Sequence, residues 1–316
     1  MSAGQERVLR RRIKSVQATK KITRAMELIA ASQIPRAQAR MRSFRPYIAA
    51  MVDVARKTAR EAAGESDRLL TVPANPRRVG IAVLAADRGL CGGYNSAVLR
   101  TADRLIAEYE RQQAECVVVA VGKKAAGFFR YRQRAVAASF SGVTARPSLA
   151  DATMIAESLR SPFLAGDLDM VRVISTRFVT AGLQRAEVST LFPIERFAPS
   201  DPGGDVEAAF PGYTEFEPLA SDLLDKVLVR YVDAFVYGAL LEASASEHVA
   251  RQRAMAAATE NADELTKTLT RTMNRVRQDA ITTEIMEVVG GAEALGKGRD
   301  DESELGRLLE QLVSGA

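Results

Sequence analysis

A glycine-rich segment in the first third of the chain has the composition of a phosphate-binding loop. It runs Asp87-Arg88-Gly89-Leu90-Cys91-Gly92-Gly93-Tyr94-Asn95, after an apolar run and before a helical pattern. Backbone N–H groups at the start of such a helix could hold a phosphate. The spacing fits neither G-x-G-x-x-G nor the Walker A motif. We therefore interpret Gly89, Gly92 and Gly93 as residues of a tight structural turn.

The side chains best suited to catalysis are few. His248 is the only histidine, and it falls in heptad register with Leu241 and Met255, which favours a place in a helix seam. Cys91 and Cys116 accompany no Cys/His cluster, so we expect two buried thiols and no zinc site. No G-x-S-x-G nucleophile elbow occurs. The sequence thus predicts no catalytic residue, no bound cofactor and no metal.

Positive charge is concentrated at the N-terminus. Residues 1–45 carry twelve basic and two acidic residues, a balance of +10, so the rest of this +5 chain sums to −5. Such a segment favours an acidic partner. Residues 1–43 contain no aromatic residue, which argues against RNA. The sequence also lacks the apolar run of roughly 18 residues that a membrane span needs, and a signal-peptide pattern, so we expect a cytoplasmic location.

The C-terminal region has the pattern of a long coiled-coil helix. Residues 219–316 contain no proline, and residues 219–289 contain a single glycine, Gly238. Six residues recur every seven positions and form one seam: Leu241, His248, Met255, Ala262, Leu269 and Val276. Ala245, Met273 and Ala280 fall on a companion seam. About 70 residues at 1.5 Å each would span roughly 105 Å. A helix of that length needs a partner helix.

The N-terminal segment supplies that partner. Its predicted apolar stripe consists of Val8, Ile13, Val16, Ile22, Met26 and Ile29. Because the two helices lie at opposite ends of the sequence, we predict a long antiparallel intramolecular coiled coil. Pro35 should kink or interrupt the first helix near residues 31–35.

The middle of the chain has an α/β pattern. Residues 78–86 and 116–121 are short, apolar and β-branched, as buried parallel strands are. Further segments extend the alternation: helical patterns at 95–113 and 149–160, and strand patterns at 171–180 and 186–194. We predict a small Rossmann-like α/β domain with crossover helices. Residues 197–218 should form an extended linker, and residues 296–316 a short amphipathic helix.

Three blocks of this sequence, in order, resemble the gamma subunit of F-type ATP synthases. The first is Arg12-Ile13-Lys14-Ser15-Val16 with Lys20-Lys21-Ile22-Thr23-Arg24-Ala25-Met26. The second is the glycine-rich segment. The third runs from Ala239-Leu240-Leu241-Glu242 through Ala258-Thr259-Glu260-Asn261-Ala262 to Arg277-Gln278 and Val288-Val289-Gly290-Gly291-Ala292. The resemblance spans about residues 5–295.

The resemblance implies a non-catalytic rotor axle inside a ring of alpha and beta subunits. Its α/β domain would stand on a membrane-embedded c-ring beside an epsilon subunit, peripheral to the cytoplasmic face of the membrane. The implied domains are 1–65 and 219–291 (paired axle helices), 66–218 (α/β domain with linker) and 292–316 (extension). The implied contacts with beta subunits are Arg277, Gln278 and Thr282, together with Lys20, Lys21, Arg24 and Met26.

Two alternatives remain open from the residues. A coiled-coil scaffold or regulator would share this architecture without assembling with alpha and beta subunits. A Rossmann-type enzyme would bind nucleotide in the isolated chain, but the missing fingerprint and the missing acid/base pair count against it.

Overall fold

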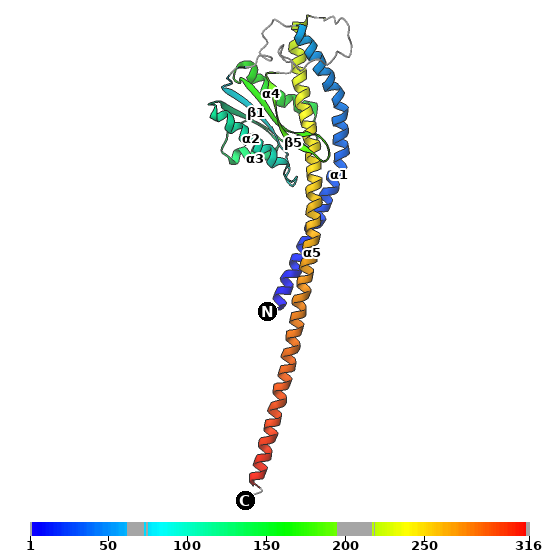
Figure 1. Ribbon diagram of the computed structural model, residues 1–316, viewed down its shortest axis with the longest axis vertical. Helices are drawn as coiled ribbons and strands as arrows, with labels where there is room; N and C mark the ends of the chain where they lie inside the picture. Colours follow the sequence, from blue (N-terminus) through cyan, green and yellow to red (C-terminus); the bar gives the residue numbers. More distant parts are fainter. Residues whose placement is uncertain (1, 62–72, 74, 195–216, 218, 314–316) are drawn as a thin grey trace. The chain divides into compact units, whose positions relative to one another are not determined.

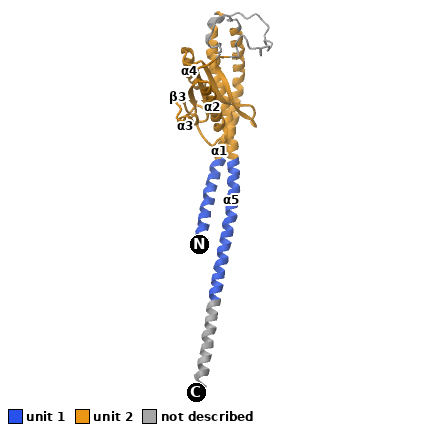
Figure 2. Cartoon of the chain, turned by 60° about the vertical axis from the view of Figure 1, so that its left-hand side comes forward, with its two compact units in different colours: residues 1–24, 257–316 blue, residues 25–256 orange. Residues whose placement is uncertain are grey.

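The chain divides into two compact units in the computed structural model. The structure describes residues 2–61, 73, 75–194, 217 and 219–313, without the side chains of 2–3, 60–61, 220–222, 225 and 293–313. One unit comprises residues 1–24 and 257–316, and the other residues 25–256 (Figure 2). Each unit packs around a seam or core of its own.

The larger unit contains a five-stranded sheet of order β3-β2-β1-β4-β5 (Figure 1). Its strands are β1 (Arg78–Leu84), β2 (Glu115–Val121), β3 (Val136–Phe140), β4 (Met170–Phe178) and β5 (Gln184–Phe192). The central strand β1 pairs in parallel with both β2 and β4, and β5 is an antiparallel edge strand. The predicted Rossmann-like α/β domain is confirmed.

Helices cover both faces of this sheet, which explains why β1 is apolar along nearly its whole length. Ile81 and Val83 belong to the core under α2 (Tyr94–Arg111) and α3 (Lys123–Tyr131). Ala82 and Leu84 belong to the core under α4 (Leu149–Ala165). The sequence patterns did not predict α3 and β3, because β3 is short and contains small and polar residues instead of a β-branched run.

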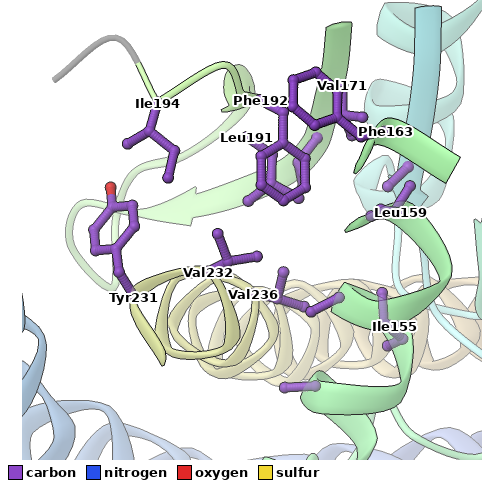
Figure 3. Close-up of a cluster of buried hydrophobic side chains, with 14 of the residues drawn as sticks. Ile155, Leu159, Phe163, Val171, Leu191, Phe192, Ile194, Tyr231, Val232 and Val236 are labelled. Atoms are coloured by element: carbon purple, nitrogen blue, oxygen red, sulfur yellow. The ribbon is translucent and has the colours of Figure 1, made fainter. Parts of the chain in front are cut away.

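Two long helices complete the chain: α1 (Ser2–Glu61) and α5 (Ala220–Val313). In the larger unit both pack on the face of the sheet that carries α4. Phe163 of α4 stacks on Phe192 of β5, with ring centroids 4.8 Å apart, and α5 adds Val232 and Val236 to this cluster (Figure 3). The α/β domain and the first part of α5 therefore share one hydrophobic core.

The predicted seam of α5 is confirmed. Leu241, His248, Met255 and Ala262 are buried at heptad spacing, and the remaining seam positions are half-buried: Leu269, Val276, Met273 and Ala280. The companion position Ala245 is also buried.

The predicted stripe of α1 is partly wrong. Val8, Ile22 and Ile29 are 55%, 61% and 62% exposed. The buried residues at heptad spacing are instead small ones: Thr23, Ala30 and Ala37. Small side chains allow close approach of a partner helix, and this places the larger isoleucines outside the seam.

Pro35 does not interrupt α1, and neither does Pro46. The predicted interruption is therefore wrong, and the predicted kink stays a prediction. A proline removes the hydrogen bond to the carbonyl four residues earlier. Pro35 and Ala31 are both exposed, as are Pro46 and Arg42. Water can therefore satisfy the two carbonyls that lose their partners.

Helix α5 continues to Val313 without ending near residue 291. Gly290 and Gly291 lie inside it, at a cost of about 1 kcal/mol each relative to alanine. Three further predictions lie outside the described part of the chain. The linker at 197–218 and the boundary at 65 and 66 fall almost wholly on residues that are not described, and the amphipathic pattern of 296–316 falls on side chains that are not described. The domain boundaries thus stay predictions.

The turn after β2 should tolerate only glycine at position 122. Gly122 has φ +94°, and a Cβ there would lie 2.0 Å from the carbonyl oxygen of Ala85. We expect Gly122→Ala to lower the free energy of unfolding by about 2 kcal/mol or more. Gly127→Ala is the control, because nothing lies within 4 Å of a Cβ there. Urea unfolding of the full-length chain measures both, and equal midpoints would contradict this account of the turn.

Candidate functional site

The glycine-rich turn follows β1 and leads into α2. Gly92 adopts φ +57°, a conformation that favours glycine. The side-chain oxygen of Asn95 accepts a hydrogen bond of 2.8 Å from the Ala86 N–H, which closes the turn against its strand. These contacts support the interpretation of a structural turn.

Asp87 connects this turn to two neighbouring loops. Its carboxylate accepts hydrogen bonds from the N–H groups of Lys123 (3.1 Å) and Gly142 (3.0 Å) and from the Thr144 hydroxyl (3.0 Å). Burial alone would raise the pKa of Asp87, but these hydrogen bonds outweigh it and hold the pKa below its ordinary value. The ends of β1, β2 and β3 are thereby tied together by one ionised carboxylate.

The strand order of this sheet reverses at β1, between its neighbours β2 and β4. Doubly wound sheets bind ligands in the crevice outside the carboxyl ends of strands at such a switch point. Here α5 contacts the segments that follow these ends. The Arg251 Nη2 group donates hydrogen bonds to the carbonyls of Arg88 (3.5 Å) and Gly89 (3.3 Å). The Glu242 carboxylate accepts a hydrogen bond of 3.1 Å from the Phe178 N–H at the end of β4.

Further contacts fix α5 on the loop after β3. The Ser244 hydroxyl donates to the Ala145 carbonyl at 3.0 Å, and His248 Nε2 lies 3.4 Å from the same oxygen. Burial lowers the pKa of the His248 imidazole, although the Ala145 carbonyl opposes this. His248 thus lies in the seam as predicted and also contacts the α/β domain. The chain's own helix occupies the place where a nucleotide would bind.

The Glu247–Arg251 ion pair lies within α5 and is buried where this helix meets the α/β domain. Arg251 Nη2 lies 2.8 Å from Glu247 Oε1, and the side chains of Glu247 and Arg251 are 3% and 10% exposed. Burial raises the pKa of Glu247, and the adjacent Arg251 guanidinium offsets part of that rise. Cys91 packs nearby with Tyr94 and Ala250, and burial raises the pKa of its thiol.

The predicted partner-contact residues occupy different surroundings. Arg277, Gln278 and Thr282 are exposed on α5, and the Thr282 hydroxyl donates to the Gln278 carbonyl at 2.9 Å. Lys21 and Arg24 are exposed on α1, and Met26 is half-buried.

The Lys20 ammonium group is hydrogen-bonded to Asp263 of α5. Next to this pair, the hydroxyls of Thr23 and Thr259 share a hydrogen bond of 2.9 Å. Asp263 lies about 20 Å along the helix from Arg277. Within the smaller unit, Lys20, Lys21 and Arg24 of α1 therefore form one group and the three residues of α5 another, and Met26 belongs to the larger unit.

An exposed apolar stretch of α5 was missed by the sequence analysis. Ile281, Ile285, Met286, Val288 and Val289 are 44%, 56%, 69%, 67% and 55% exposed. Gly4 of α1 and Val276 of α5 line a groove between these helices, and the apolar stretch lies further along α5 than this groove. A difference in helix length could have indicated this stretch, because a shorter N-terminal helix cannot cover the whole of a longer C-terminal one.

Among the residues that the structure describes, no helix is long and apolar enough to cross a membrane. Among the same residues, no group of three or more His, Cys, Asp or Glu side chains could hold a metal ion.

Paired terminal helices with a Rossmann-like domain between them define a coiled-coil stalk protein. The sequence model of a family described as ATP synthase matches residues 5–295. The ATP synthase gamma chain of Parafrankia sp. (strain EAN1pec) is 44% identical over 302 residues, which cover 94% of this chain and 99% of that protein. The gamma chain of Kineococcus radiotolerans is 44% identical over 301 residues, covering 93% and 97%.

A solved structure has the same fold. A chain of the Euglena gracilis mitochondrial ATP synthase OSCP/F1/c-ring assembly superimposes with a TM-score of 0.68 at 18% identity, covering 94% of this chain and 96% of that one. The family model and the relatives above settle the family. The chain belongs to the ATP synthase gamma chain family.

The Asp87 contacts predict a pH-dependent effect on stability. A carboxylate whose pKa is lowered on folding stabilises the fold above its unfolded pKa of about 3.9, and this is lost as pH falls through the folded value. We expect Asp87→Asn to lower the free energy of unfolding at pH 7 by about 1–2 kcal/mol. The difference should shrink as the pH falls below about 4.

Chemical denaturation at several pH values measures this difference. The control is Asp103→Asn, since Asp103 has a surface contact of 3.5 Å with Arg132, and it should change stability by no more than about 0.5 kcal/mol. An Asp87→Asn effect that stays constant down to pH 2 would contradict the account.

Proposed function

We propose that this chain is the central-stalk subunit of a rotary ATP synthase. It couples ion-driven rotation of a membrane ring to ATP synthesis and hydrolysis at catalytic sites on beta subunits. The observation that best supports this is the exposed apolar stretch from Ile281 to Val289. An exposed apolar surface of this kind marks a site of protein–protein contact. In the proposed complex, this end of α5 would contact the surrounding alpha and beta subunits through apolar side chains.

The mechanism follows from the asymmetry of such an axle. An axle whose surface differs around its circumference contacts chemically identical sites differently, so each site has its own affinity for nucleotide at a given moment. Rotation changes which site binds tightly. Because binding and rotation are linked, ion flow drives ATP release and hydrolysis drives ion pumping. The chain itself carries no catalytic residue in this account.

The proposed partners are the alpha and beta subunits, an epsilon subunit and the c-ring, at the cytoplasmic face of the membrane. The α/β domain would stand on the c-ring. Arg277, Gln278 and Thr282 would contact beta subunits, as would Lys21, Arg24 and Met26. Lys20 is already paired with Asp263, so an acidic group of a partner would compete with the Asp263 carboxylate for the Lys20 ammonium group.

Purification of the tagged chain from its native membranes tests this function. We expect one copy of the chain to copurify with three alpha and three beta subunits and with Mg-ATPase activity. Recovery with unrelated partners would instead favour a coiled-coil scaffold, and nucleotide bound by the isolated chain would favour a Rossmann-type enzyme.

The exposed polar residues on α5 predict a loss of turnover. Replacing both Arg277 and Gln278 with alanine removes hydrogen-bonding groups without touching a buried contact. We expect ATP turnover of the reconstituted complex to fall about tenfold, with the circular dichroism spectrum of the chain unchanged. Lys267→Ala, at an exposed position of the same helix, is the control. Wild-type turnover in the double variant would argue against these two contacts.

A further inference from the structure

His248 lies where three parts of the larger unit meet. It is the only histidine of the chain, and it is 7% exposed. Its neighbour on α5, Ala245, packs with Ala37 of α1 in one hydrophobic cluster. Its Nε2 atom lies 3.4 Å from the Ala145 carbonyl of the loop after β3. A change of charge at this side chain therefore affects α1, α5 and the α/β domain together.

The Ala145 contact fixes the tautomer of the imidazole. A carbonyl oxygen only accepts hydrogen bonds, so Nε2 of His248 carries the hydrogen and donates it. Nδ1 is then the unprotonated nitrogen, and it is the atom that takes up a second proton. A neutral ring of this kind fits a seam that is lined by apolar side chains.

Two positive charges act on this imidazole. Arg251 lies three residues further along α5, and Arg40 lies on α1. The Arg40 Nε atom is buried, so water screens this guanidinium only in part. Arg146, in the loop after β3, is exposed. The carboxylate next to His248 in the sequence, that of Glu247, is already paired with Arg251 at 2.8 Å. An imidazolium would therefore add a third positive charge beside two guanidinium groups.

These surroundings determine how the fold responds to pH. Burial lowers the pKa of the His248 imidazole, the Ala145 carbonyl opposes this, and Arg251 and Arg40 lower the pKa further. A group whose pKa falls on folding stabilises the fold above its unfolded pKa, which is about 6.5 for histidine. That stability is lost as the pH falls through the folded value. Acid therefore weakens the fold at this position.

We propose that His248 is an acid-sensitive switch in the pairing of α1 and α5 on the α/β domain. At neutral pH the uncharged ring holds the seam closed against the loop after β3. On acidification Nδ1 takes up a proton, and the imidazolium, repelled by Arg40 and Arg251, favours states in which the seam opens to water. The switch belongs to the fold of this chain and goes beyond the proposed function. In the proposed complex, the same opening would loosen the stalk when the surrounding solution becomes acidic.

Two carboxylates near His248 titrate in their own ranges. Burial raises the pKa of Glu247, so its protonation on acidification stabilises the fold and opposes the effect of His248. The pKa of Asp87 lies below its ordinary value of 3.8, so this group stays ionised between pH 5 and pH 7. A variant that lacks only the imidazole therefore isolates the contribution of His248.

The test compares the untagged full-length chain with three variants. His248→Gln keeps a polar side chain that is neutral at every pH. Arg40→Gln removes one of the two charges that act on the imidazole, and Arg36→Gln removes a charge from an exposed position of the same helix. Hydrogen exchange gives protection factors for the amides of residues 37–44 and 244–251 at pH 7 and pH 5. Isotope labelling of histidine gives the imidazole pKa by NMR, because the chain has a single histidine.

We expect the protection factors of the wild type, relative to those of His248→Gln, to fall about tenfold between pH 7 and pH 5. In Arg40→Gln the imidazole pKa should rise towards its ordinary value, and the fall should be smaller. Arg36→Gln should match the wild type. If His248→Gln does not fold, the comparison of Arg40→Gln with Arg36→Gln tests the same repulsion.

Three results would overturn this inference. The first is an imidazole that titrates at or above a pH of about 6.5. The second is a ratio of protection factors, wild type to His248→Gln, that is the same at both pH values. The third is an imidazole pKa in Arg40→Gln equal to that of the wild type, which would contradict the repulsion by Arg40. All three are measured on the chain alone, so they are distinct from a failure to assemble with alpha and beta subunits, which would refute the proposed function instead.

Discussion

The structure depends on the fact that α5 cannot bury its own apolar stripe. Helix α5 runs from Ala220 to Val313, and an isolated helix gains most of its stability from packing against a partner. In the larger unit that partner is the sheet with α1, and in the smaller unit it is the N-terminal part of α1. Beyond Ala280 the described residues offer no partner, and the side chains from Ile281 to Ala292 are exposed.

Because α5 needs a packing partner, the α/β domain offers this helix a surface that other doubly wound folds use for a ligand. A doubly wound sheet offers a crevice at its switch point, and in most such folds a ligand fills it. Here Glu242 and Arg251 of α5 reach the ends of the loops that border the crevice. One fold thus supports a mechanical role because its binding crevice holds a helix, which agrees with the rule that function depends on the site and not on the fold.

Much of the architecture could be predicted from the sequence. The heptad spacing of Leu241, His248 and Met255 gave the seam of α5, because helix geometry repeats over any length. The β-branched runs gave the buried strands. The stripe of α1 failed at Ile22 and Ile29, because a seam built from Thr23 and Ala30 has no hydrophobic signal that exceeds its neighbours.

The contacts that seat α5 could not be predicted. They join Arg251 to carbonyls of Arg88 and Gly89, more than 160 positions away in the sequence, and a backbone carbonyl has no residue type that a pattern could detect. The pairing of Lys20 with Asp263 was hidden for a related reason. Basic residues are frequent in the first helix, and only the register between the two helices decides which one meets an acid.

Rotation of this chain inside its complex tests the central claim most directly. A probe attached through Tyr131→Cys, at a side chain that is 86% exposed, reports motion of the α/β domain while the alpha and beta subunits are immobilised. Cys116→Ser keeps the half-buried native thiol from competing for the label. The account predicts rotation in one direction when ATP is added. ATP hydrolysis with a stationary probe would contradict it.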